Sequence, residues 1–145
     1  MIRELSINDL DSIYVLGDTL HNNYKSLNSY RDLNEGVNKT YIISESDVIV
    51  GFIHVQELID EIDIIDVVVC EKYRNKGYAT MLFNYCFNKY SNRKFILEVS
   101  SGNIPALNLY KKMGFKVINI RNKYYGISDA YVMEKRWILW KIHLF

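Results

Sequence analysis

The segment from Asp66 to Thr80, DVVVCEKYRNKGYAT, most constrains the fold of this chain. An apolar, β-branched run ends there in a short polar turn, and a helical pattern follows directly. Arg74, Gly77 and Ala79 give the turn the pattern R-x-x-G-x-A. The first backbone N–H groups of a helix have no partner within the helix, and the helix dipole adds partial positive charge. The segment therefore predicts either a plain strand-to-helix connection or a backbone site for an anion such as a diphosphate.

Size and composition fit one folded domain. The chain has 145 residues, 49% of them hydrophobic, and a formal net charge of +1, so nothing predicts capture by nucleic acid or by an acidic membrane. No apolar run in the chain is long enough to span a membrane, and we see no signal-peptide core at the N-terminus. Cys70 and Cys86 lack metal-ligand spacing, and Cys70 has no activating base at an obvious spacing. We expect a cytoplasmic protein with reduced thiols and no metal.

Hydrophobic periodicity predicts that strands alternate with helices in the middle of the chain and meet as hairpins near its ends. The region 21–38 is polar and fits a second short helix or an ordered loop. Asn8 is the expected N-cap of the first helix. The pattern implies an α/β (α+β) domain with a mixed sheet of six to seven strands and about four helices. Expected strands are 2–6, 41–44, 48–58, 62–70, 95–99, 115–125 and 130–134; expected helices are 7–20, 77–90 and 103–112.

The strand 62–70, the helix 77–90 and the strand 95–99 form a predicted βαβ crossover, so the two strands should run parallel. Ligands in such sheets bind beyond the carboxyl ends of the strands, which is where the R-x-x-G-x-A turn lies.

Two residues downstream have side chains suited to proton transfer. Glu98 lies in the middle of the short apolar strand, on the face opposite Phe95, Leu97 and Val99. Either it pairs with a neighbour such as Arg93 or Lys94, or it is a general base whose pKa is raised by partial burial. Tyr110, late in the next helix, is either a core aromatic or a phenol that can protonate a leaving group.

The two motifs together carry a family resemblance. R-x-x-G-x-A after a strand, followed by N-x-x-A-x-x-L-Y-x-x-x-G-F, resembles the GNAT superfamily of acyl-CoA-dependent N-acetyltransferases across nearly the whole chain. Within that superfamily, LEVSSGN, LYKKMGF and RNKYYGISDAYVM look most like the ribosomal-protein alanine N-acetyltransferases. Those enzymes acetylate the α-amino group of a ribosomal protein.

The resemblance implies a role for each matching residue. Glu98 would be the general base and Tyr110 the general acid in direct attack of an amine on the thioester of acetyl-CoA, within a ternary complex. The backbone of the central strand would pair with the pantetheine arm, the turn and helix start would hold the pyrophosphate, and Asn103 would lie on the cofactor side. The implied cofactor-binding residues are Val67, Val68, Val69, Arg74, Asn75, Lys76, Gly77, Tyr78, Ala79, Thr80 and Asn103.

The acceptor is less defined than the acetyl donor. The stretch 18–31, DTLHNNYKSLNSYR, lacks the aromatic-Pro-Trp segment usual in the ribosomal-protein enzymes. The alternatives are therefore a protein N-terminus, a small amine such as a polyamine, amino sugar or antibiotic, and a non-catalytic acyl-CoA-binding module. An acidic acceptor pocket could draw on Glu57, Asp60, Glu61, Asp63 and Asp66.

We expect one domain over residues 1–136 and an apolar tail, 137–145, that packs on this domain or at an interface between chains. The protein could be a monomer or a homodimer.

Overall fold

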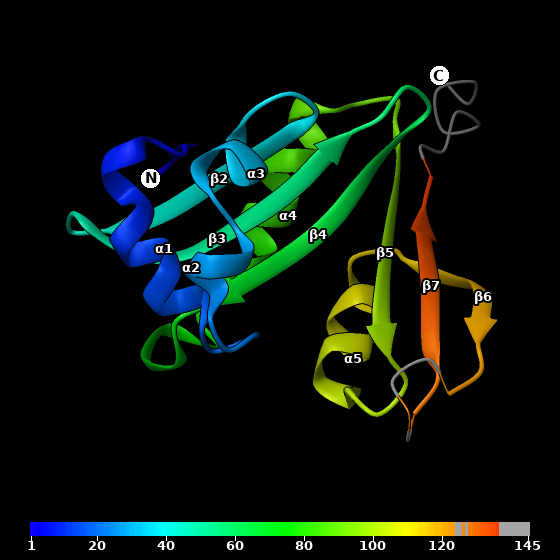
Figure 1. The fold of residues 1–145 in the computed structure, drawn as a ribbon. Coiled ribbons are helices and arrows are strands. Elements are labelled where there is room, and N and C mark those ends of the chain that lie inside the picture. Colours follow the sequence, from blue (N-terminus) through cyan, green and yellow to red (C-terminus); the bar gives the residue numbers. More distant parts are fainter. Residues whose placement is uncertain (124–125, 127, 137–145) are drawn as a thin grey trace.

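One mixed sheet organises residues 1–123, 126 and 128–136, which the computed structural model describes. Its seven strands lie in the order β1-β2-β3-β4-β5-β7-β6, and β4 and β5 form the only parallel pair among them (Figure 1). The predicted tail 137–145 lies outside the described residues. The strands are β1 (Ile2–Glu4), β2 (Asn38–Glu45), β3 (Val48–Glu57), β4 (Glu61–Val69), β5 (Lys94–Ser100), β6 (Lys116–Arg121) and β7 (Ala130–Lys135).

Helices cover both faces of the sheet. The described helices are α1 (Leu10–Gly17), α2 (Tyr24–Leu27), α3 (Tyr30–Asn34), α4 (Tyr78–Lys89) and α5 (Ile104–Lys112), with 3-10 turns η1 (Ile7–Asp9) and η2 (Glu71–Tyr73). Leu82, Phe83 and Cys86 from the predicted stripe of α4 are fully buried in the larger core. Tyr24 and Phe52 belong to a second core, on the face covered by α1 to α3 (Figure 1). Burial on both faces accounts for the near-continuous apolar runs of the central strands.

The N-terminal helix starts differently from the prediction. Asn8 was expected as the N-cap, but Ser6 caps the preceding turn, and its hydroxyl accepts a hydrogen bond from the Asn8 N–H at 3.4 Å. The Asp9 carboxylate accepts from the Ser6 N–H in return, at 2.7 Å, which completes a capping box. At its other end, α1 stops at Gly17 rather than at residue 20.

The polar region 21–38, where a second short helix or an ordered loop was expected, contains two short helices, α2 and α3. Ser29 and Asp32 form a capping box at the start of α3. The strand predicted over 115–125 ends at Arg121, because the Lys123 N–H turns to donate to the Asp129 carboxylate at 2.7 Å. No described helix is long and apolar enough to cross a membrane.

The parallel pairing of β4 with β5 is confirmed, but it covers only Glu61–Asp63 against Lys94–Ile96. Beyond these three pairs the two strands diverge (Figure 1). The pairing of β4 with β3 shifts register between His54 and Val55, which leaves Ile65 as an extra residue in β4. A bulge of this kind bends the strand and increases its twist. The bend coincides with the point where β4 leaves β5.

Candidate active site

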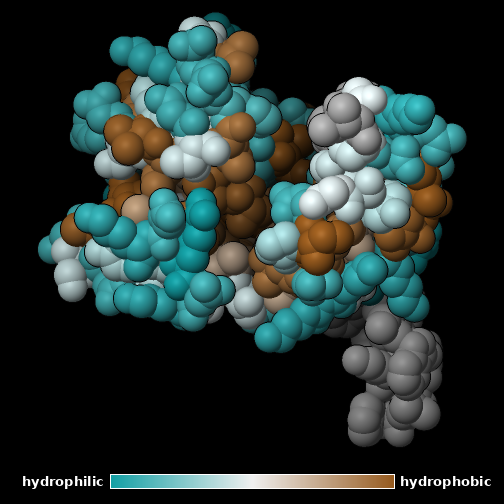
Figure 2. All heavy atoms as spheres, turned by 90° about the horizontal axis from the view of Figure 1, so that it is seen from below, coloured by the Kyte–Doolittle hydropathy of each residue, from teal (hydrophilic) through white to brown (hydrophobic). Residues whose placement is uncertain are grey.

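A cavity of about 700 Å³ lies in the region where β4 and β5 have separated. Its walls come from the end of β4, the turn after it, the start of α4 and one face of α5. Figure 2 shows the molecule hollowed there, with hydrophobic residues between the half that carries α1 to α4 and the half that carries β5 to β7. The lining residues are Thr19, Leu20, Val67, Val68, Val69, Tyr73, Arg74, Asn75, Gly77, Tyr78, Ala79, Thr80, Asn103, Pro105, Ala106, Leu109, Tyr110 and Lys112.

The predicted anion-binding turn forms one end of this cavity. Asn75 and Gly77 have positive φ angles of 62° and 86°, so the chain turns sharply before α4 begins at Tyr78. Gly77 is the N-cap of α4, and a Cβ placed on it would meet no heavy atom within 4 Å. The first amides of α4 and the space beside Gly77 therefore suit a phosphate group approached by backbone. These features fit the diphosphate of acetyl-CoA.

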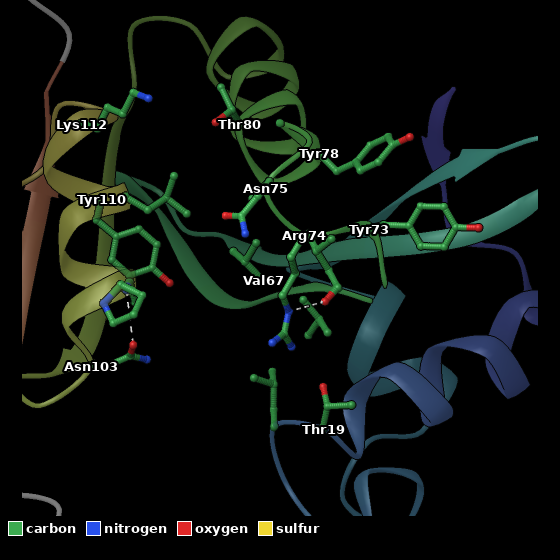
Figure 3. A pocket seen from close by; sticks show the side chains of 18 residues that line it. Thr19, Val67, Tyr73, Arg74, Asn75, Tyr78, Thr80, Asn103, Tyr110 and Lys112 are labelled. Carbon is green, nitrogen blue, oxygen red and sulfur yellow. Dashed lines mark hydrogen bonds between the residues drawn. The ribbon is translucent and has the colours of Figure 1, made fainter. Parts of the chain in front are cut away.

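Of the two cationic side chains predicted beside this turn, Arg74 lies on the cavity wall and Lys76 does not. Arg74 lines the cavity, and its Nε donates to the Val69 carbonyl oxygen at 3.1 Å (Figure 3). Lys76 is not among the lining residues; its Nζ lies 5.4 Å from the centre of the Tyr73 ring. Lys112, which sequence reasoning did not single out, lines the cavity from the end of α5 (Figure 3). Its spacing from Asn103, Ala106 and Leu109 along the helix was the available signal.

The end of β4 supplies the predicted strand wall. Val67, Val68 and Val69 pair with Ile53, Phe52 and Gly51 of β3 on one side. On the other side, pairing with β5 has already ended at Asp63. A strand edge exposed in this way offers backbone N–H and C=O groups to an extended ligand, as in β-strand addition. The amide chain of pantetheine is such a ligand.

Tyr110 belongs to the core and also reaches the cavity. Its ring packs edge-on against Phe83, with 5.8 Å between ring centres, and against Phe115 at 6.1 Å. The side chain also lines the cavity, and its hydroxyl points into it (Figure 3). Burial, together with the negative charge of Asp66, raises the pKa of Tyr110. The phenol therefore stays protonated and able to donate at neutral pH.

Asn103 lies on the cavity wall at the start of α5. Its side-chain oxygen accepts a hydrogen bond from the Ala106 N–H at 3.3 Å and so caps the helix. The residue thus fixes the position of the helix that carries Tyr110.

Glu98 is not among the residues that line the cavity. Its carboxylate lies 3.0 Å from the Arg121 guanidinium, on β6, and 31% of its side-chain surface is exposed. The partners expected from sequence, Arg93 and Lys94, were therefore wrong. Arg93 instead donates to the backbone carbonyls of Leu58 and Ile59. The general-base role of Glu98 stays a prediction.

Asp63 and Asp66, two of the acidic residues expected near an acceptor, flank the bulge in β4. Burial, followed by contact with Glu61 and the charge of Glu98, raises the pKa of Asp63 to about 7. One Asp63 oxygen is buried and has no hydrogen-bond partner among the described residues. Burial also raises the pKa of Asp66, although the hydrogen bond from Tyr24 opposes this effect. Among the described residues, no group of His, Cys, Asp and Glu is placed to hold a metal ion.

Comparisons with known proteins agree with this geometry. Residues 7–115 match the family model described as "Acetyltransferase (GNAT) family". The chain is 28% identical over 152 residues to the N-alpha-acetyltransferase of Saccharolobus solfataricus, covering 92% of this chain and 91% of that protein. It is 34% identical over 90 residues to the ribosomal protein bS18-alanine N-acetyltransferase of Haemophilus ducreyi, covering 60% of this chain and 62% of that protein.

A solved structure shows the same fold. The ribosomal-protein-S18-alanine N-acetyltransferase from Escherichia coli superposes with a TM-score of 0.78 at 22% identity, over 94% of this chain and 92% of that one. The match to the family model covers both the R-x-x-G-x-A turn and the helix that carries Tyr110. The chain therefore belongs to the GNAT acetyltransferase family and is an acetyl-CoA-dependent N-acetyltransferase.

Proposed function

We propose that this enzyme acetylates the α-amino group of a protein N-terminus, with a ribosomal protein as the acceptor. The observation that carries the proposal is the gap between β4 and β5, where Val67–Val69 form one wall and Tyr110 the other. The gap gives an amine access to a thioester held along β4. Relatives named N-alpha-acetyltransferase, similar over 91–92% of this chain, favour an α-amino group over a small amine.

The proposed reaction is direct attack of the neutral amine on the thioester carbonyl of acetyl-CoA. The new C–N bond forms as the C–S bond breaks, and the thiolate of coenzyme A takes a proton from the Tyr110 hydroxyl. Glu98 accepts the proton that the amine loses. Because Glu98 is not on the cavity wall, we infer that a water carries this proton. Val67–Val69 hold the acyl-pantetheine arm, and the turn at Arg74, Asn75 and Gly77, together with the Tyr78–Thr80 amides, holds the diphosphate.

An acetyl-transfer assay tests the acceptor. Purified enzyme and acetyl-CoA are incubated with a peptide that has a free N-terminal alanine, with the same peptide formylated at its N-terminus and carrying an internal lysine, and with spermidine. Mass spectrometry and release of coenzyme A report transfer. We expect acetylation of the free N-terminus only. Transfer to spermidine alone would overturn the proposed acceptor.

The role of Glu98 has a matched test, because Arg121 shares its ion pair. Glu98→Gln should lower kcat by about 100-fold or more, whereas Arg121→Gln breaks the same ion pair and should retain most of the activity. Acetyl-CoA affinity should persist in both variants. Equal, small effects of the two substitutions on kcat would reduce Glu98 to a structural ion-pair residue.

A further inference from the structure

The segment between α1 and α2 fixes one carboxylate beside the gap. The Tyr24 hydroxyl donates to Asp66 Oδ2 at 2.9 Å, and the Tyr24 N–H donates to the Asp18 carboxylate at 2.9 Å. The Tyr24 ring is fully buried and lies against Gly17 so closely that a Cβ there would come within 2.3 Å of it. The position of Tyr24, and through its hydrogen bond the position of Asp66, is therefore fixed by α1, the following loop and α2.

Asp66 lies directly before Val67, which lines the cavity, and directly after the extra residue Ile65. Only 14% of its side-chain surface is exposed. Across the gap, its charge is felt by Tyr110, whose pKa it helps to raise. Thr19, on the same segment as Tyr24, also reaches the cavity wall (Figure 3). Asp66 itself is not among the lining residues, but it lies between Val67 and the residues after α1, Thr19 included, that form the wall opposite α5.

The groups that face Asp66 leave much of its charge uncompensated. The Tyr24 hydroxyl satisfies Oδ2, while Oδ1 has the exposed His21 Nε2 at 3.9 Å, beyond hydrogen-bond distance. His54, on β3, is the cross-strand neighbour of Asp66, but burial lowers the pKa of His54 to about 4 and keeps the imidazole neutral. Tyr110 is neutral as well. A largely buried carboxylate without a close cation is costly unless a bound cation compensates it.

We propose that Asp66 is the residue that binds the positively charged amino group of the acceptor, and that Tyr24 holds Asp66 in position for this contact. The proposal rests on the proposed function only in requiring an amine acceptor. The substrate class is therefore a primary amine that is a cation when it binds. Glu98 keeps the separate, predicted role of removing a proton, so two carboxylates divide recognition and chemistry.

The test compares wild-type enzyme with Asp66→Asn on two peptides that differ only in the N-terminal group. One has a free α-amino group, and the other has an aminooxy group, which is uncharged at neutral pH. Loss of a charge-assisted hydrogen bond should raise KM for the charged peptide by about 10- to 100-fold, with a smaller change in kcat. KM for the aminooxy peptide and the Kd of acetyl-CoA should stay within about twofold. Asp47→Asn removes an exposed carboxylate in the turn between β2 and β3 and should change neither KM.

Tyr24→Phe separates positioning from packing, since the ring stays and only the hydroxyl is lost. The hydrogen bond from Tyr24 lowers the pKa of Asp66, so its removal should raise that pKa. The acidic limb of kcat/KM for the charged peptide should then move to higher pH. A purely structural role would leave this limb in place. This shift of the acidic limb in Tyr24→Phe also tests the role of Asp66 if the Asp66→Asn variant fails to fold.

Two results would overturn the proposal: an unchanged KM for the charged peptide in Asp66→Asn, or an equal loss with both peptides. If the wild-type enzyme acetylates spermidine but no peptide, the proposed acceptor fails on its own. The same comparison of KM in Asp66→Asn, made with spermidine, then still tests Asp66.

Discussion

Asp63 is held at a cost to folding at neutral pH, and replacing it with Asn should stabilise the protein there. The carboxyl group lies at the last rung where β4 pairs with β5, opposite Ile96. Burial, contact with Glu61 and the charge of Glu98 all raise its pKa, from 3.8 to about 7. The folded protein therefore resists losing a proton that the unfolded chain loses above about pH 4.

The sign and size of the effect follow from this difference. A carboxyl group whose pKa is raised by folding supports the folded state fully below its unfolded pKa, and this support is lost as the pH rises toward about 7. Since one pKa unit is worth about 1.36 kcal/mol, the full rise in the pKa of Asp63 would correspond to a destabilisation of about 4 kcal/mol above pH 7. Asp63 is only partly buried, and solvent screens the charges of its neighbours, so we expect about 1–2 kcal/mol.

Urea denaturation followed by circular dichroism measures the outcome. The free energy of unfolding of Asp63→Asn should exceed that of the wild type by about 1–2 kcal/mol at pH 8, and the two should converge at pH 4. Asp60→Asn, in the exposed turn before β4, removes the same charge without the burial and should show no such pH dependence. A difference that does not change with pH, or a variant less stable at pH 8, would refute the reasoning.

Two further substitutions probe the acetyl-CoA site. Gly77→Val places a β-branched residue at φ 86° in the open space beside the first turn of α4, and should raise the acetyl-CoA Kd by about tenfold or more in calorimetry. Gly36→Val is the control, because Gly36 also has positive φ and open space but does not line the cavity; an equal change in Kd would contradict the phosphate assignment. Tyr110→Phe keeps the packing on Phe83 and Phe115 and should lower kcat by about 100-fold with acetyl-CoA affinity retained. Unchanged turnover would remove Tyr110 from the mechanism.

Local pattern was enough to predict the elements that form the proposed donor half of the site. The strand ending at Val69 and the apolar stripe of α4 follow the periods of a strand and a helix, and Gly77 marks the turn between them. The same pattern could not orient Lys76, since a turn residue can face the ligand or turn toward a neighbour. Here the neighbour is the Tyr73 ring.

The acceptor half depends on contacts between distant residues. Tyr24 and Asp66 are 42 positions apart, and nothing local to either residue indicates that they meet. Glu98 pairs with Arg121 because β7 places β6 near β5, a sheet order that no local pattern specifies. By contrast, Ser29 and Asp32 carry a capping-box signature, so α3 could have been predicted.

The bulge at Ile65 connects these two halves physically. One extra residue in β4 turns the strand away from β5, and interstrand pairing stops at Asp63. The backbone of Val67–Val69 then lacks β5 as a partner on that side, which makes it available to the pantetheine arm. The same extra residue shifts the alternation of β4 by one position, so that Asp66 faces Tyr24 while Val67 packs toward the core under α4. A single irregularity thus opens the donor site and sets the acceptor-side carboxylate next to it, which explains why the two proposed binding functions meet at adjacent residues.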